Sequence, residues 1–221
     1  MLIALTVITG VVDATSYLRL GHVFVANMTG NVVFIGFALA GARGLSASSS
    51  LIALGSFVLG AWAGGRFGAL HHDHRGHLLR IASFAQAVLL VLALVIAVTV
   101  TRPLRTPESY ALLVPMAVSM GLQNAAAQLL AVPELTTTVL TRTLTGIATE
   151  LGLLGHPGGI GPTFLRRLVS VAAMLLGALA GGLLVLHVSV AAALALAAAL
   201  VLVVAIAAHL LSRPAAPWVA P

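Results

Sequence analysis

The residues best suited to chemistry in this 221-residue chain are polar side chains that lie within apolar stretches. Asp13 is the sharpest of them, because it lies inside the apolar stretch 1–20 with Ser16 and Tyr17 on the same helical face. A carboxylate in such a setting could couple transport to a proton or a cation. It could equally be a paired or capped residue that only locks two helices together. Both interpretations stay open at this point.

A second polar group follows at Asn27, Thr29, Gly30 and Asn31. Asn27 and Asn31 are one helical turn apart, and Gly30 permits a bend or a close contact. Together they could interrupt a membrane helix and expose backbone groups to a bound solute. The alternative is hydrogen bonding between helices, which is common for Asn and Thr in membrane bundles. We favour a binding site.

Both polar groups return later in the chain, which predicts an internal duplication. Asp13 matches Asn124 at an offset of 111 residues, and a one-residue insertion then sets Thr29 against Thr141. The flanking residues agree, since Gly10 and Ala14 correspond to Gly121 and Ala125. A carboxylate in one half and an amide in the other indicates that the two sites have diverged, so that only one of them would titrate.

The second polar element is the denser one, with a stripe of threonines around Arg142. An arginine within the membrane needs a partner, and Asp13 is the acid in a comparable place, which predicts an ion pair between them. The predicted substrate site consists of Asp13, Tyr17, Asn27, Thr29, Gly30, Asn31, Gln123, Asn124, Thr137, Thr138, Thr141, Arg142 and Thr145.

Composition excludes a soluble protein. The chain is 60% hydrophobic and 7% charged with a mean hydropathy of +1.13, whereas a soluble domain carries about 25% charged residues. All 11 basic residues are arginines scattered at segment ends, so the net charge of +6 indicates membrane topology and not a nucleic-acid partner. The expected partners are the lipid bilayer and a small-molecule solute, with no nucleic acid. Cysteine is absent, which removes disulfides and thiolate metal sites.

Eight segments can be read along the chain. Six are strongly apolar: 1–20, 48–68, 78–101, 108–132, 164–187 and 189–211. Two more polar ones, 23–42 and 134–154, are still long enough to span. We predict an all-α fold, a polytopic transmembrane helical bundle of two related four-segment halves with six to eight crossings. The expected parts are a first membrane repeat 1–101, a linker 102–107, a second repeat 108–211 and a C-terminal tail 212–221.

The number of crossings decides how the repeats are related. If the polar segments cross fully, the repeats are parallel; if they re-enter, each half has three crossings and the repeats are inverted. With six or with eight crossings, six arginines lie on the side of the termini and four on the opposite side. Since arginines are more frequent on the cytoplasmic side, both termini are expected in the cytoplasm of a bacterial cell, with the protein in the inner membrane. We favour eight crossings, because 31–42 is apolar enough to continue across the membrane.

Two further patterns are weaker. Gly60, Gly64 and Gly68 lie at four-residue steps, as do Gly177 and Gly181, a spacing that lets helices approach closely in lipid. The histidine-rich stretch 71–77 could bind a divalent metal, but a solvated basic turn is the more common reason for such a loop. We expect no metal and no cofactor. No enzymatic motif is visible, and we do not expect an enzyme.

Taken together, the motifs resemble the YoaK-like family of small multi-pass bacterial membrane proteins, which is grouped as a domain of unknown function. The resemblance rests on the motifs around Asp13, Asn27–Asn31, Gly121–Ala126 and Thr136–Thr145, and it covers nearly the whole chain. It implies a polytopic inner-membrane protein and brings no substrate or catalytic residue with it. Our leading hypothesis is a transporter or permease of a small polar or anionic solute. The alternative is a non-transporting scaffold or accessory subunit whose polar residues hold helices together.

Overall fold

The computed structural model describes residues 1–70, 75–100, 106–130, 140–150 and 162–211. These residues form eight helices: α1 Leu2–Arg19, α2 Met28–Leu39, α3 Ala47–Leu70, α4 Arg75–Thr99, α5 Thr106–Leu129, α6 Leu140–Glu150, α7 Pro162–His187 and α8 Val190–Leu211. The expected all-α membrane bundle is confirmed. By length and composition, α3, α4, α7 and α8 can each cross a membrane.

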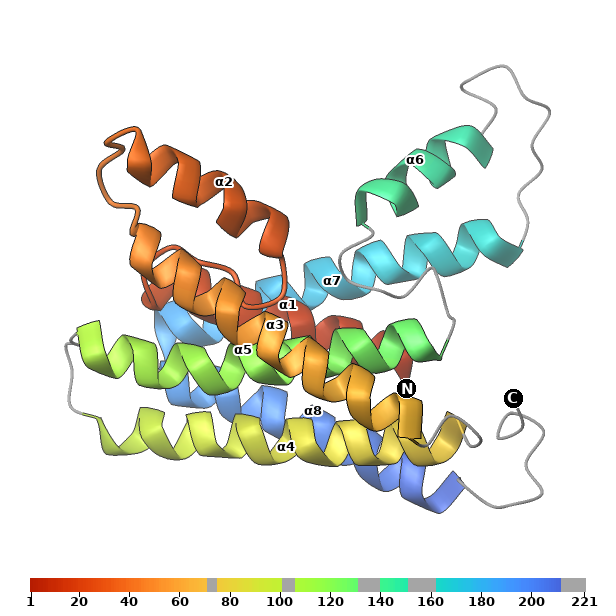
Figure 1. The fold of residues 1–221 in the computed structure, drawn as a ribbon. Coiled ribbons are helices and arrows are strands. Elements are labelled where there is room, and N and C mark those ends of the chain that lie inside the picture. The colour runs from red at the N-terminus through yellow and green to blue at the C-terminus, as the bar shows by residue number, and fades with distance from the viewer. Residues whose placement is uncertain (71–74, 101–105, 131–139, 151–161, 212–221) are drawn as a thin grey trace.

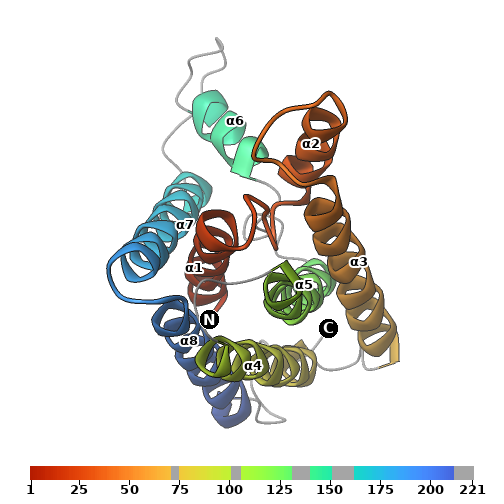
Figure 2. The ribbon, with the colours of Figure 1, turned by 90° about the vertical axis from the view of Figure 1, so that its left-hand side faces the viewer.

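Two helices, α1 and α5, run through the middle of the bundle (Figure 2). They are surrounded by α3, α4, α7 and α8, whose outer faces carry many exposed leucines and valines. The central position explains why α1 and α5 carry the buried polar residues Asp13, Gln123 and Asn124, because only there can such groups find partners away from lipid. Membrane proteins keep ionisable residues toward the bundle interior for this reason.

The helices pair across the two halves of the chain. The two most extensive contacts are α3 with α5 and α1 with α7, so the first helix of each half packs on the third helix of the other half. The next most extensive contacts join α4 with α8, α4 with α5 and α1 with α8. In Figure 1, α1 and α5 run in opposite directions, as do α3 and α7, and α4 and α8.

Glycines allow the helix backbones to approach closely at these crossings. This confirms that their four-residue spacing serves helix packing. A Cβ added to Gly60 of α3 would collide with the Val118 backbone of α5, and one added to Gly177 of α7 would collide with the Val7 backbone of α1. Gly64 and Gly181 continue the same two crossings one turn later. Backbones therefore touch directly, which brings dispersion contacts and short interhelical distances.

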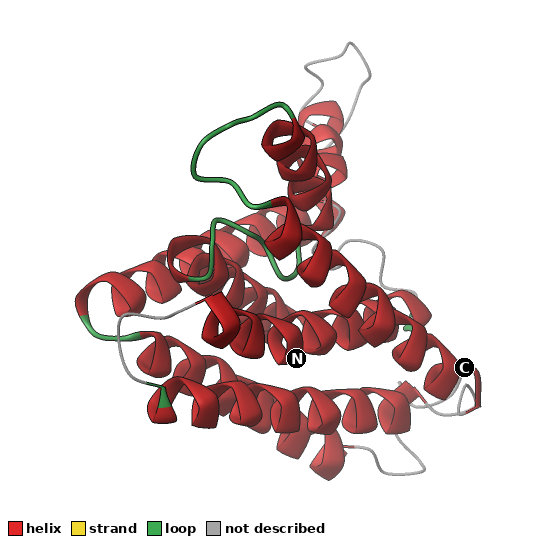
Figure 3. Ribbon diagram, turned by 60° about the vertical axis from the view of Figure 1, so that its left-hand side comes forward, coloured by secondary structure: helices red, strands yellow, loops and turns green. Residues whose placement is uncertain are grey.

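The second element of the chain is shorter than the membrane-spanning helix that we predicted over 23–42. Helix α2 has 12 residues and is thus about 18 Å long, short of the roughly 30 Å hydrocarbon core. It protrudes from the long helices beside α3, and α6 protrudes beside α7 (Figure 1); the loops on either side of α2 are green in Figure 3. Six long helices remain, and the end of α3, the start of α4 and the end of α8 lie at the same end of the molecule as Met1 (Figure 1).

Candidate functional site

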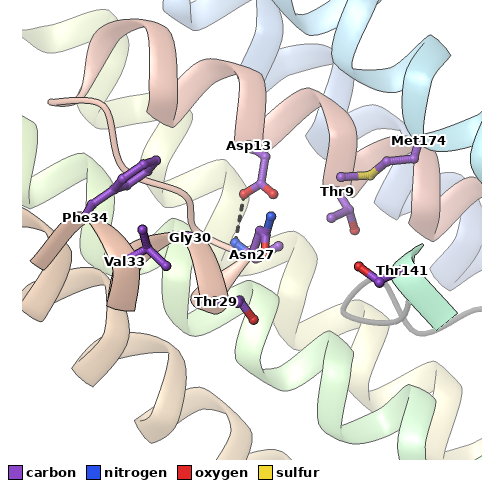
Figure 4. Close-up of a pocket in the computed structure, with 10 residues that line it drawn as sticks. Thr9, Asp13, Asn27, Thr29, Gly30, Val33, Phe34, Thr141 and Met174 are labelled. Carbon is purple, nitrogen blue, oxygen red and sulfur yellow. Dashed lines mark hydrogen bonds between the residues drawn. The ribbon is translucent and has the colours of Figure 1, made fainter. Parts of the chain in front are cut away.

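Asp13, within α1, binds the connection that leads into α2. Its side chain is 4% exposed, and its Oδ1 accepts hydrogen bonds from the backbone N–H groups of Val25 at 2.9 Å and Ala26 at 2.8 Å. Figure 4 shows the bond from Ala26. Those two amides precede the helix and need a partner outside it. The carboxylate supplies that partner and thereby fixes the start of α2.

Asn31 fixes the same connection from the other side. Its Oδ1 accepts the Phe24 N–H at 2.9 Å, and its Nδ2 donates to the Phe24 carbonyl oxygen at 2.6 Å. The side chain is fully buried, and both ends of the amide are used by one backbone residue. Asn31 therefore holds the chain in place and does not line the cavity described below.

Tyr17 belongs to an aromatic cluster. Its ring stacks on Phe24 with centroids 5.0 Å apart and meets His22 edge-on at 5.2 Å, while the Phe34 ring lies against both, 5.7 Å from Phe24 and 6.1 Å from Tyr17. Gly30 lies beneath this cluster, since a Cβ there would come within 2.7 Å of the Phe24 ring. The glycine is thus required by ring packing at the start of α2.

A cavity of about 360 Å³ opens beside Asp13 (Figure 4). Its walls come from α1, α2, α6 and α7. The lining residues are Thr9, Asp13, Ala26, Asn27, Thr29, Gly30, Val33, Phe34, Thr141 and Met174. Five of the predicted site residues therefore meet here: Asp13, Asn27, Thr29, Gly30 and Thr141. The two threonines that the sequence comparison paired, Thr29 and Thr141, face one common cavity although they are 112 positions apart.

Both short helices begin at this cavity. Thr29 is the second residue of α2, and Thr141 is the second residue of α6. The first N–H groups of a helix have no partner within it, and the helix dipole makes this end positive. Asn27, the N-cap of α2, makes no side-chain capping bond to these amides. The start of α2 therefore directs partial positive charge toward the cavity, next to the carboxylate of Asp13, and the described part of α6 also begins there.

Gln123 was also predicted to contact a solute, but it lies in a polar network between three helices. Its Oε1 accepts a hydrogen bond from Gln86 Nε2 of α4 at 2.6 Å. Its Nε2 donates to Thr9 Oγ1 of α1 at 2.9 Å and to the Leu5 carbonyl at 3.3 Å. This network ties α4 and α1 to α5 at the centre of the bundle. Gln123 acts there as an interhelical link.

Asn124 lines a second cavity, of about 470 Å³, with walls from α3 and α5. Its Nδ2 donates to the Met120 carbonyl of its own helix at 3.0 Å. The position mirrors that of Asp13, because Phe57 and Ala61 of α3 approach Gly121 there just as Met174 and Ala178 of α7 approach Gly10. The remaining lining residues are Gly65, Ala125, Gln128 and Leu129.

The chain matches the model of one protein family, described as "Protein of unknown function (DUF1275)", over residues 1–207. It belongs to this family. It is also 32% identical over 156 residues to the UPF0700 transmembrane protein YoaK of Bacillus subtilis (strain 168), and this match covers 68% of the chain and 66% of that relative. No solved structure matches the chain. The YoaK-like resemblance read from the motifs is thereby confirmed, and the chain is a multi-pass membrane protein.

Several predicted positions of this DUF1275 member cannot be placed at the cavity. Thr137 and Thr138 lie outside the described residues, as does the side chain of Arg142, although its backbone is in α6. Thr145 is exposed, and its Oγ1 bonds back to the Thr141 carbonyl at 2.9 Å. The ion pair between Asp13 and Arg142 therefore stays a prediction.

Of the histidine-rich stretch, 71–74 lies outside the described residues, and the described residues hold no cluster that could bind a metal.

Sequence reasoning missed Thr9 and Met174, which line the cavity, and Gln86, which bonds to Gln123. Thr9 lies one turn before Asp13 on the same face of α1, so helical periodicity could have found it. Gln86 is a buried polar residue in a largely apolar helix, a signal that was present in the sequence. Met174 comes from α7, and nothing in the sequence pointed to its place beside Asp13. Its position depends on the crossing of α1 and α7.

Proposed function

We propose that this protein is a permease for a small solute with an anionic or strongly polar group, and that the Asp13 cavity is its binding site. One observation carries the proposal: α2 and α6 both begin at a cavity that also holds a buried carboxylate. Transporters commonly build solute sites from short or broken helices whose positive ends point at an anionic group. The proposed role of the protein is binding and movement of the solute, without covalent chemistry.

The proposed class of solute follows from the residues that line the Asp13 cavity. The amides at the start of α2 and the hydroxyls of Thr29 and Thr141 can donate hydrogen bonds to an anionic or carbonyl oxygen. The Asp13 carboxylate would repel an anion in its charged form, so a proton or a cation taken up at Asp13 would favour solute binding. Asp13 is therefore the proposed coupling group. A volume of about 360 Å³ is in the range of pockets for small molecules.

The proposal includes two inverted repeats, 1–101 and 108–211. The reciprocal packing supports them: Gly60 against Val118 and Gly177 against Val7 are one contact made twice with the halves exchanged. The opposite directions of α1 and α5 support inversion, as does the length of α2. Inverted repeats let the same chain form an inward-open and an outward-open state.

The helices form two groups whose relative motion could convert an inward-open state into an outward-open one. One group contains α1, α7 and α8 with α6, and the other contains α3, α4 and α5 with α2. They meet mainly along α4 and α8, and α1 and α5 are joined by the hydrogen bonds from Gln123 to Thr9 and Leu5. The proposed motion is rocking of the two groups about the α4–α8 contact, which would change access to the cavity. The proposed location is the bacterial inner membrane with both termini in the cytoplasm, as the arginine distribution favours.

The test is transport by the purified full chain in proteoliposomes. A panel of small carboxylates, amino acids, inorganic phosphate and polyols is offered with and without a proton gradient, and uptake is measured. Thr29→Val and Thr141→Val should each lower uptake of the transported solute at least several-fold, because each removes one lining hydroxyl. Thr15→Val is the matched control, since Thr15 is buried in α1, bonds to the Val11 carbonyl and does not line the cavity.

Site access can be measured separately because the natural chain has no cysteine. Thr29→Cys and Thr141→Cys should react with a small charged thiol reagent, and the transported solute should slow the reaction. Thr15→Cys should stay unreactive. Failure of the folded protein to move any panel solute, together with unreactive cavity cysteines, would contradict the permease proposal.

A second candidate function is a membrane scaffold or accessory subunit. The network of Gln86, Gln123 and Thr9 favours it, because these polar groups satisfy one another within the bundle. The two candidates differ in the cavity: a scaffold predicts that Thr29→Val and Thr141→Val have no phenotype, while changes in the Gln86–Gln123 network still destabilise the fold.

A further inference from the structure

The outer face of the bundle carries a groove between α4 and α8 that is separate from the Asp13 cavity. Its volume is about 500 Å³, and its walls are almost wholly apolar. The apolar lining consists of Ile81, Phe84, Ala85, Leu202, Ala205 and Ile206. Phe84 is 63% exposed and Ile206 57% exposed, so the groove faces the space that acyl chains occupy in a membrane.

Two basic side chains close one end of this groove. Arg80 lies near the start of α4 and His209 near the end of α8, which is the same end of the molecule because the two helices run in opposite directions. Arg80 Nη1 lies 3.5 Å from His209 Nδ1. A guanidinium can only donate, so His209 accepts through Nδ1 and presents Nε2–H as a donor. The remaining guanidinium N–H groups and Nε2–H are donors from which a phosphate can accept hydrogen bonds.

We propose that this groove binds one anionic phospholipid, with its phosphate at Arg80 and His209 and an acyl chain along the apolar wall. Shape and charge agree with this occupant, since donors lie at one end and hydrocarbon contacts lie along the rest. No acidic side chain lines the groove in the described part of the chain, so an anionic headgroup meets no repulsion there. Basic pockets between membrane helices bind anionic headgroups in this way.

Native mass spectrometry of the full chain in detergent tests the proposal. Phosphatidylglycerol and phosphatidylcholine with identical acyl chains are titrated separately, and the first lipid adduct is quantified. Phosphatidylglycerol should bind more tightly than phosphatidylcholine. Arg80→Gln should weaken phosphatidylglycerol binding about fivefold, as expected for one basic residue at an anionic headgroup. His209→Leu should weaken it in the same direction, because it removes the second donor.

The matched charge control is Arg66→Gln. Arg66 is an exposed arginine near the end of α3, at the same end of the molecule, and it does not line the groove. Its removal lowers the net charge equally and should leave the first adduct unchanged. Equal loss in Arg66→Gln and Arg80→Gln would show general charge attraction and would overturn the site. Equal affinity of the two lipids for the natural chain would overturn it as well.

The acyl-chain part is tested by filling the groove. Ala85→Phe, with Ala85→Leu as a milder second variant, should weaken the adduct, whereas Ala172→Phe on the exposed face of α7 should not. Thermal unfolding identifies which variants are folded, and only those are compared. Inorganic phosphate at millimolar concentration should not displace the lipid. Displacement by phosphate, or an unaffected adduct in folded Ala85→Leu, would overturn a phospholipid as the occupant.

Discussion

The Oδ1 atom of Asp13 accepts a hydrogen bond from the backbone N–H of Ala26 at 2.8 Å, so a residue within α1 holds the start of the short helix α2. This relationship explains how α1 tolerates a buried carboxylate. Backbone amides that cannot pair within a helix stabilise the acceptor, and the acceptor satisfies those amides. The same contact sets one wall of the cavity, and it links the stability of the connection to any change in the charge of Asp13.

The first prediction separates hydrogen bonding from charge at position 13. Asp13→Asn keeps an oxygen that can accept from Val25 and Ala26, whereas Asp13→Ala leaves both amides without this acceptor. We expect Asp13→Ala to lower the free energy of unfolding by about 1–3 kcal/mol and Asp13→Asn to lower it less. Thermal unfolding in detergent measures both. In proteoliposomes, uptake by Asp13→Asn should no longer respond to a proton gradient. Equal instability of the two variants would show that the charge, and not the acceptor, holds the connection.

The second prediction concerns the ion pair expected between Asp13 and Arg142. If the two side chains neutralise each other, Asp13→Asn and Arg142→Gln should each lower transport, because each leaves the other charge unpaired. The double variant should then recover part of the loss. A double-mutant cycle on uptake rates is the measurement. Additive losses in the cycle would show that the two residues act independently.

The third prediction addresses the Gln86–Gln123 bond. Gln123→Leu removes the acceptor for Gln86 in the centre of the bundle and should lower the free energy of unfolding by about 1–2 kcal/mol. Gln86→Leu combined with Gln123→Leu should destabilise less than the sum of the single changes. Unfolding by heat in detergent tests this. Thr99→Ala is the control, since Thr99 is exposed and bonds only within its own helix; its effect should be close to zero.

The fourth prediction concerns the glycines at the two closest helix crossings. Gly60→Ala and Gly177→Ala place a methyl group against a neighbouring backbone and should each destabilise by about 1–3 kcal/mol. Gly55→Ala, which meets nothing within 4 Å on the same helix as Gly60, should leave stability unchanged. Similar losses at Gly55 and Gly60 would mean that helix flexibility, and not close packing, requires the glycines.

The fifth prediction fixes the topology. Six crossings put His77 on the side of the termini and Arg43 on the opposite side, whereas eight crossings reverse this arrangement. Single cysteines at these two positions can be labelled without background, because the natural chain has none. With an impermeant thiol reagent on whole cells, Arg43→Cys should react and His77→Cys should react only after the membrane is opened. The reverse pattern would restore the eight-crossing arrangement.

Much of the fold follows from local sequence. The long apolar segments were predicted to within a few residues, because a membrane helix needs a continuous apolar stretch and Pro103 and Pro107 mark a break between two of them. Segment 23–42 forms a shorter helix than we predicted. Its apolar residues end at a 12-residue helix, and hydropathy cannot distinguish a short helix held by Asp13 and Asn31 from a spanning one.

The sequence by itself determined that the chain is a membrane protein of helices, and that polar residues gather around Asp13 and again around Asn124. It also pointed to Thr29 and Thr141, because residue type and spacing are local properties. Only the tertiary structure decided that these two threonines line one cavity, and that Asn31 and Gln123 bond within the protein instead. Helix partners are chosen by surfaces far apart in the chain, as where Gly177 meets Val7, and no local pattern encodes such a contact.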